Sequence, residues 1–395
     1  MTFPETEILT SLVSRVFRID DITAGNPEKG YLARYRGQLL IEDSAAAYDQ
    51  LADSLKPYGI TPLFRIEDGR HVIYLGPSRP EPKESNISTN IMLFVLTVFS
   101  VLFAGVQMAE IEGPVPTDEM GLLLFLLKNI WMGWPFAVSL LGILLAHEFG
   151  HYLMSRYHKT PATLPYFIPF PLSPLGTMGA AILMRGIPKN KRILFDIGVA
   201  GPLAGLVVAI PVLLIGLSLS STGIIVPSPN GFIEGNSLLY LAAKFVVFRQ
   251  LLPAPVEPQG ILYWIRYFFT GGPVPFGGTD VFIHSVAFAG WAGILVTALN
   301  LIPAGTLDGG HVIYSLFGEK AKKAFPFIIG TMAALGLYWN GWWLWAVLLF
   351  WLGRVNAEPL DQITQLDPKR RIIAAVVIVI FLLVFMPVPF VTLAQ

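Results

Sequence analysis

Two histidines and one glutamate lie close together in the sequence Ala146-His147-Glu148-Phe149-Gly150-His151. On an α-helix, residues four apart share a face, with Cβ atoms about 5–6 Å apart. Both imidazoles can therefore bind one Zn²⁺ ion at roughly 2.0–2.1 Å. Glu148 is rotated by about 100° from His147, which suits a base acting on water better than a third metal ligand. The spacing predicts a hydrolytic zinc centre with His147 and His151 as ligands and Glu148 as the catalytic base.

A catalytic zinc site usually has three protein ligands and a fourth position for water. The best candidate for the third ligand is Asp308, which follows the stretch Asn300-Leu301-Ile302-Pro303-Ala304-Gly305-Thr306-Leu307. Proline and glycine interrupt a helix here, and non-helical backbone at membrane depth is tolerated where it lines a buried cavity. His311 is a rival ligand, although we favour local pairing or capping as its role.

The composition places these residues in an apolar chain. Of the 395 residues, 54% are hydrophobic and 14% are charged, against about 45–50% and 25% in soluble globular domains. The chain has no cysteine, which excludes disulfides, thiolate ligands and cysteine nucleophiles. The formal net charge is zero and no long basic run occurs, so no nucleic-acid partner is expected. The composition favours a protein that lies in a lipid bilayer.

The fold class expected from the apolar stretches is a polytopic α-helical membrane protein with about six to seven transmembrane helices, because about 20 apolar residues cross a bilayer. The expected spans are residues 91–108, 134–156, 193–219, 284–302, 325–339, 342–353 and 372–391. An ionisable residue in mid-span costs about 2.5–3.5 kcal/mol. His147, Glu148 and His151 lie within little more than one turn of the second span, so they are expected to have a compensating partner such as a metal ion.

Residues 1–82 are expected to form a small soluble α+β domain, joined by a linker at 83–90 to a transmembrane domain at 91–395 that holds the predicted zinc centre. Helical apolar spacing covers residues 8–17 and 43–55, and strand-like alternation covers 31–40. Residues 61–75 read as a hairpin that turns at Asp68-Gly69. The first seven residues lack the features of a cleavable signal, so the first span is expected to serve as one.

The orientation follows from lysine and arginine, which gather in cytoplasmic loops. These residues cluster before the first span, between the second and third spans, and after residue 318. The N-terminal domain and the side of the membrane that holds His147 and His151 are therefore expected to be cytoplasmic, or on the stromal equivalent of that side.

The pairing of His147-Glu148-x-x-His151 with Asn300-x-x-Pro303-x-x-x-Leu307-Asp308-Gly309 resembles the site-2 protease family of intramembrane zinc metalloproteases. The stretch Gly198-Val199-Ala200-Gly201-Pro202 is similar to the family's glycine-proline motif, and the resemblance covers about residues 134–318. It implies a zinc metalloendopeptidase that cleaves single-span membrane proteins within or near the bilayer. By the same resemblance, Asn300 would position the scissile segment or stabilise the oxyanion. The chain looks like the branch without a PDZ domain, with a small soluble front domain, found in cyanobacteria and chloroplasts.

Residues 163–188 are rich in proline and glycine, which forbid a helix and favour extended backbone. In the resembling family, an edge strand in this segment pairs with the unwound substrate, as β-augmentation allows. An ordinary loop is the alternative.

A second class of function also fits buried ionisable residues: a membrane transporter or ion-binding protein whose histidines and Asp308 line an ion path. Asp196 in the third span is expected to pair with Arg192 or to cap a helix, without a catalytic role. Nothing in the sequence specifies the substrate or the oligomeric state.

Overall fold

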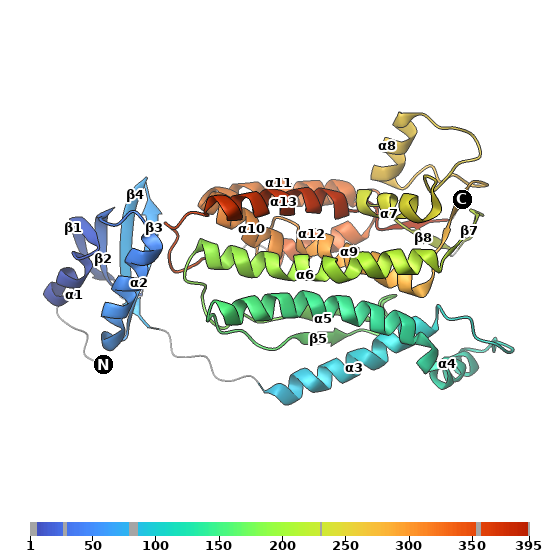
Figure 1. Ribbon diagram of the computed structural model, residues 1–395, viewed down its shortest axis with the longest axis horizontal. Helices are drawn as coiled ribbons and strands as arrows, with labels where there is room; N and C mark the ends of the chain where they lie inside the picture. The colour runs from blue at the N-terminus through green and yellow to red at the C-terminus, as the bar shows by residue number, and fades with distance from the viewer. Residues whose placement is uncertain (1–5, 27–29, 79–85, 230, 353–356, 394–395) are drawn as a thin grey trace.

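The structure is a computed structural model that describes residues 6–26, 30–78, 86–229, 231–352 and 357–393. A small sheet with two helices lies at one end of an elongated group of helices, and α7, α8, β7 and β8 lie at the other end (Figure 1). The N-terminal elements are α1 (Thr6–Val13), β1 (Phe17–Asn26), β2 (Tyr31–Leu39), α2 (Ser44–Leu55), the 3₁₀ turn η2 (Lys56–Tyr58), β3 (Ile60–Glu67) and β4 (Arg70–Pro77).

The elements up to residue 300 are α3 (Ile87–Val106), α4 (Glu119–Lys128), η3 (Ile130–Gly133), α5 (Trp134–Tyr157), β5 (Tyr166–Pro169), β6 (Thr177–Ala181), α6 (Lys191–Ser218), β7 (Ser221–Ile224), β8 (Phe232–Glu234), α7 (Leu238–Phe248), α8 (Ile261–Thr270), β9 (Thr279–Phe282) and α9 (Ser285–Asn300). They are followed by α10 (Asp308–Phe317), η4 (Gly318–Ala324), α11 (Phe325–Leu335), α12 (Gly341–Leu352), α13 (Pro368–Val384) and β10 (Phe390–Thr392).

The N-terminal strands form an antiparallel sheet in the order β1-β2-β4-β3. The predicted hairpin is confirmed, because β3 and β4 pair up to Glu67 and Arg70, and Asp68 and Gly69 both have positive φ. The predicted helix at 8–17 is too long. Phe17 instead begins β1, whose backbone pairs with β2 at Leu39.

Three helical segments of the described chain are long and apolar enough to cross a membrane: Ile87–Val106, Ile130–Tyr157 and Lys191–Ser218. They match the first three expected spans and support the prediction of a membrane protein. The first helix begins four residues earlier than expected, because the Asn86 side chain accepts a hydrogen bond from the Ser88 N–H and caps it. The later apolar helices are shorter, so the count of six to seven spans stays a prediction.

Glycine residues allow the central helices to pack closely around α6. A methyl group at Gly150 of α5 would lie 2.5 Å from the Ala200 carbonyl oxygen of α6, and one at Gly290 of α9 would lie 2.6 Å from Leu213. Small residues are the usual means of close helix packing in a bilayer, where lipid is as apolar as the side chains. This packing brings α5, α6 and α9 together in one hydrophobic core, which includes the fully buried Trp291.

Residues 357–367, which we call the strap, join the N-terminal sheet to the helices. The Phe64 N–H in β3 donates to the Leu360 carbonyl at 2.9 Å, and the Gln362 N–H donates back to Phe64 at 3.0 Å. On its other edge the strap donates from the Asp361 N–H to the Lys189 carbonyl at 2.7 Å, just before α6. Ile363 packs into the same hydrophobic core as the N-terminal elements. The core of the expected domain 1–82 therefore includes side chains of the strap.

Asp361 holds the strap in place. It is fully buried and its carboxylate accepts hydrogen bonds from the Ser44 hydroxyl at 3.1 Å and from the Ile363 N–H at 2.8 Å, and further ones from the N–H and hydroxyl of Thr364. A buried carboxylate is stable only when such donors replace its hydration. Asp361 thus links the start of α2 to the strap.

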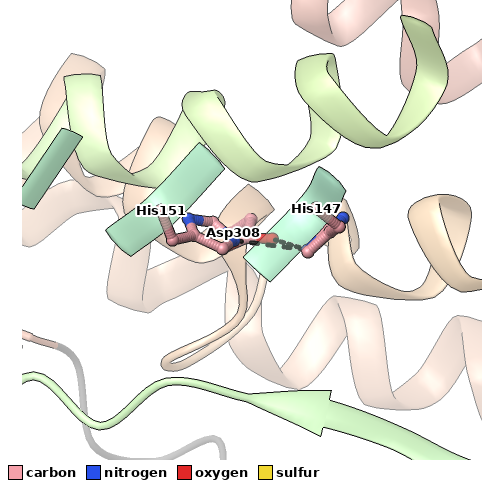
Figure 2. A group of neighbouring side chains, drawn as sticks. All are labelled: His147, His151 and Asp308. Atoms are coloured by element: carbon pink, nitrogen blue, oxygen red, sulfur yellow. Dashed lines mark hydrogen bonds and ion pairs between the residues drawn. The ribbon is translucent and has the colours of Figure 1, made fainter. Parts of the chain in front are cut away.

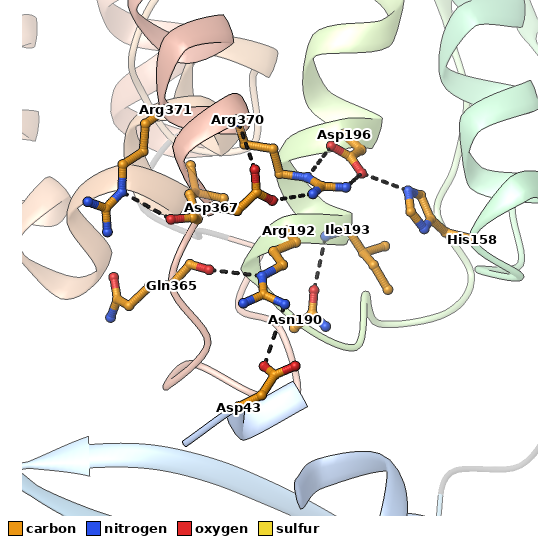
Figure 3. A network of polar contacts seen from close by, with 11 residues as sticks. Asp43, His158, Asn190, Arg192, Ile193, Asp196, Gln365, Asp367, Arg370 and Arg371 are labelled. Atoms are coloured by element: carbon orange, nitrogen blue, oxygen red, sulfur yellow. Dashed lines mark hydrogen bonds and ion pairs between the residues drawn. The ribbon is translucent and has the colours of Figure 1, made fainter. Parts of the chain in front are cut away.

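A network of charges lies beside the strap at the start of α6 (Figure 3). Asp196 accepts two hydrogen bonds from the Arg370 guanidinium, at 2.8 and 2.6 Å, and contacts the His158 ring at 2.9 Å. Arg192 instead donates to the Gln365 carbonyl at 3.0 Å and pairs with Asp43 at 3.5 Å. The expected Asp196–Arg192 pair is therefore wrong. Arg370 from α13 offers the two-pronged geometry that a carboxylate prefers.

The substitution Asp361→Asn should weaken the contact between the N-terminal sheet and the strap. The carboxylate accepts hydrogen bonds at both oxygens, whereas the amide of asparagine would place its own N–H groups opposite some of the same donors. A buried mismatch of this kind costs about 1–3 kcal/mol. We expect hydrogen exchange at the Phe64 and Gln362 amides to accelerate about 10–100-fold. The matched control is Asp49→Asn, which removes an exposed ion pair with Lys189 and should change the exchange little. Equal exchange in the two variants would disprove the role of Asp361.

Candidate metal centre and active site

The first two predicted ligands lie on the buried face of α5. His147, Glu148 and His151 are 3%, 5% and 7% exposed, in a helix whose other residues are largely apolar. The helix begins at Trp134 and carries Pro135 in its first turn, where a missing N–H costs nothing. Helical spacing places the two imidazoles on consecutive turns, with ring centroids 4.9 Å apart.

Asp308 lies between the two imidazoles (Figure 2). Its Oδ2 is 3.4 Å from the His147 Nε2, its Oδ1 is 3.3 Å from the His151 Nε2, and the two Nε2 atoms are 3.2 Å apart. The three residues form one group whose ligand atoms all lie within 4.8 Å of one another. The structure thus brings together all three residues that the sequence nominated as ligands.

These spacings suit one zinc ion. Ligand atoms at about 2.0–2.1 Å from a tetrahedral centre lie roughly 3.3–3.4 Å from one another. The 3.2 Å between the two Nε2 atoms agrees with one edge of such a tetrahedron, and the Asp308 carboxylate has one oxygen at 3.4 Å from the first imidazole and the other at 3.3 Å from the second. Two imidazoles with one carboxylate are a donor set that Zn²⁺ accepts. The residues present therefore fit the metal.

A contact of the His151 Nδ1 atom determines the tautomer of this imidazole. His151 Nδ1 lies 2.7 Å from the carbonyl oxygen of Ile197 in α6. A carbonyl only accepts, so Nδ1 carries the proton and Nε2 presents its lone pair to the group. Sequence reasoning missed this contact, because a main-chain acceptor leaves no signal in the residue types.

Three glycines on one face of α6 make room for three histidines. A methyl group at Gly201 would collide with the His151 imidazole, and one at Gly205 would lie 3.2 Å from the His147 Nδ1. One at Gly198 would lie 2.8 Å from the His311 Cβ. Gly198 and Gly201 belong to the glycine-proline motif noted in the sequence. In the structure, a larger residue at either position would collide with a histidine side chain.

Asp308 reaches the site because the chain between α9 and α10 is not helical. Helix α9 ends at Asn300 and α10 begins at Asp308, as the intervening proline and glycines predicted. Gly309 passes so close to the Leu301 carbonyl that any side chain would collide with it. Gly305 has φ +57, a conformation that glycine adopts readily.

A cavity of about 410 Å³ opens onto the group. It is lined by His147, Glu148, His151, residues 180–184, Ile197, Asn300, residues 306–308, His311 and Ala357. Glu148 faces this cavity without belonging to the ligand group, as expected of a base. The Asn300 Nδ2 lies 3.4 Å from the His147 Nε2, at one flank of the ligands. His311 is not a member of the ligand group either.

The predicted extended segment lines the same cavity. Strands β5 and β6 form an antiparallel pair, with Phe167 opposite Ala180. The chain then runs from β6 along residues 182–184 beside the ligands. Ala357 of the strap lies in the cavity wall too. No sequence signal marked it, because its place depends on the docking of the strap.

Known proteins are similar to this chain in sequence. The family model described as "Peptidase family M50" matches residues 135–338. "Probable zinc metalloprotease EGY1, chloroplastic" of Oryza sativa subsp. japonica is 30% identical over 76% of this chain and 50% of its own length. "Probable zinc metalloprotease EGY2, chloroplastic" of Oryza sativa subsp. indica is 27% identical over 96% of this chain and 66% of its own length. The chain therefore spans about half to two thirds of the length of these curated relatives.

The substitution Gly201→Ala should push the His151 imidazole out of the ligand group and abolish tight metal binding, because its methyl group would occupy the space of the ring. Metal analysis of the purified protein measures this as a fall from about one zinc per chain to near zero. The control is Gly142→Ala in α5, where a methyl group meets nothing within 4 Å and zinc should be retained. Full zinc content in Gly201→Ala would contradict the steric account.

Proposed function

The chain belongs to peptidase family M50, the family of site-2 zinc metalloproteases that the sequence predicted, and we propose that it hydrolyses peptide bonds of membrane-spanning substrate proteins. The observation that carries the proposal is the group of His147, His151 and Asp308, whose spacings suit one tetrahedral zinc ion. Glu148 faces the same cavity. Together they provide a complete set of residues for metal-assisted hydrolysis.

His147, His151 and Asp308 would hold the zinc ion. When bound, zinc supplies Lewis acidity that activates water and polarises a carbonyl group. The Ile197 carbonyl keeps the His151 Nε2 unprotonated, so this ligand is ready to bind without a change of tautomer. The predicted cofactor is therefore Zn²⁺.

Glu148 acts as the base in the proposed reaction. It takes a proton from the attacking water as the water oxygen bonds to the carbonyl carbon. It then delivers that proton to the amide nitrogen as the carbon–nitrogen bond breaks. The products are a carboxylic acid, which keeps the second proton of the water, and an amine, and Glu148 returns to its starting state.

Asn300 is proposed to hold the scissile segment. Its side-chain amide lies beside the His147 Nε2, so its N–H groups are within reach of a peptide that crosses the ligand group. This placement supports the role that the family resemblance implied, which is to position the substrate or to stabilise the oxyanion.

The proposed substrate is an unwound stretch of a single-span membrane protein. In the described structure β6 has one strand partner, β5, and the chain that follows it lines the cavity. A substrate strand that paired with this wall would satisfy its own main-chain groups and present its carbonyl to Glu148 and the metal. The pairing is the proposed reason why the segment is extended.

The proposed arrangement in the membrane is multi-pass, with residues 1–82 as a domain on the cytoplasmic or stromal-equivalent side. The apolar helices support insertion, and the strap joins the sheet to the start of α6, a region rich in lysine and arginine. No observation favours the alternative of a transporter.

The substitution Glu148→Gln should lower cleavage of single-span model substrates in liposomes by about 10²–10⁴-fold, the usual contribution of a positioned base. Bound zinc should stay at about one per chain, because this substitution leaves the three ligands unchanged. The control Glu119→Gln alters a carboxylate at the start of α4, away from the cavity, and should cleave normally. Normal cleavage by Glu148→Gln would contradict the assignment of Glu148 as the base. A parent protein that binds no zinc after supplementation would contradict the proposed protease function.

A further inference from the structure

His311 is a buried residue in the cavity whose imidazole has no hydrogen-bond partner among the described residues. It lies in the first turn of α10, three residues after Asp308, and is 7% exposed. Its side chain lines the cavity with the metal ligands and Glu148. The sequence led us to expect local pairing or capping for this residue, but within the described chain the imidazole neither pairs nor caps.

The ring nitrogens of His311 are not among the fully enclosed side-chain atoms without a partner, which fits a ring that borders the cavity. A polar ring without a protein partner is explained when it meets a partner during function. The neutral imidazole has one N–H donor and one acceptor, so the cavity has a donor that the protein itself does not use. The missing partner of His311 is therefore to be sought among the molecules that enter the cavity.

The packing of α6 sets the place of His311 in the site. Along α6, Gly198, Gly201 and Gly205 lie against His311, His151 and His147 in that order. Each step is three or four residues, or about 4.5–6 Å of helix. Asn300 adjoins His147, so His311 lies at the opposite end of the row of histidines.

From this arrangement we propose that His311 is a further catalytic residue, which donates its N–H to the oxygen of the scissile carbonyl as negative charge develops there. The inference rests on the proposed protease function. When water attacks, the carbon–oxygen π electrons move to the carbonyl oxygen, and the His311 N–H donates a hydrogen bond to that oxygen. The His311 proton is not transferred, because Glu148 carries the one proton that passes to the amide nitrogen.

His311 and Asn300 then have different tasks. Asn300, beside His147, holds the peptide in the ground state. His311, beside Asp308 and Gly198, acts on the charge of the transition state. A donor aimed at the oxyanion is worth about 10²–10³-fold in kcat, and it contributes little to the binding of the uncharged substrate.

The test compares His311→Leu, which removes the donor, with His311→Gln, which keeps an N–H donor at about the reach of the imidazole Nε2. In His311→Leu we expect kcat to fall about 10²–10³-fold, with KM within about threefold of the parent and about one zinc still bound. His311→Gln should recover at least about tenfold of that loss. Thermal unfolding of each variant, compared with the parent, identifies a folding defect.

A second measurement uses a phosphinic peptide, whose tetrahedral phosphorus group mimics the charged intermediate. Its affinity for His311→Leu should fall in parallel with kcat/KM, whereas a merely structural role would not produce that correlation. The inference is overturned by parental kcat in a folded His311→Leu protein, by loss of zinc in both variants, or by an effect confined to KM. Failure of the parent to show zinc-dependent cleavage would instead overturn the proposed function.

Discussion

The structure depends on the close approach of α6 to the helices that carry the ligands. The side chains of the candidate ligand group come from α5 and from the start of α10, and both pack against one face of α6. Imidazoles are bulky, and a helix with ordinary side chains at positions 198, 201 and 205 would hold them away. The glycines therefore provide the room in which two turns of α5 and one of α10 meet. The same contact supplies the Ile197 carbonyl that orients His151.

The cavity walls are connected to the N-terminal sheet through the strap. Residues 180–184 and Ala357 both line the cavity. A few residues further along the chain, 188–189 and 360–361 are hydrogen-bonded to each other, and the strap is also bonded to Phe64 of β3. The sheet at one end of the molecule (Figure 1) is thus connected through the strap to two segments of the cavity wall. The buried Asp361 and the charges around Asp196 hold this connection together.

Several charged groups within the apolar part are paired with one another. Asp196 is neutralised by Arg370 and contacts His158, and the buried Lys244 pairs with Asp280 at 3.1 Å. These contacts fit the high cost of an unpaired charge away from water. The described residues also include buried atoms without a hydrogen bond, such as the Ser155 and Ser315 hydroxyls. Among the cavity residues, the His311 ring makes no hydrogen bond to the described chain. Unpartnered polar groups in a cavity point to chemistry more readily than to stability.

The sequence by itself determined the family, the candidate ligands and most helices, because these depend on local spacing. His147 and His151 share a helix face at any i, i+4 spacing, long apolar runs predict membrane helices, and Pro303 with Gly305 predicts the break before Asp308. The structure then brought Asp308 to the two histidines.

Other features were decided only by tertiary contacts. Strand β1 forms because β2 pairs with it, despite the polar residues Asp20 and Asp21. The partner of Asp196 was likewise decided by where α13 lies. The Ile197 carbonyl, the placement of Ala357 and the unpartnered state of the His311 ring depend on segments far apart in the chain, and residue types alone do not encode which of these segments meet.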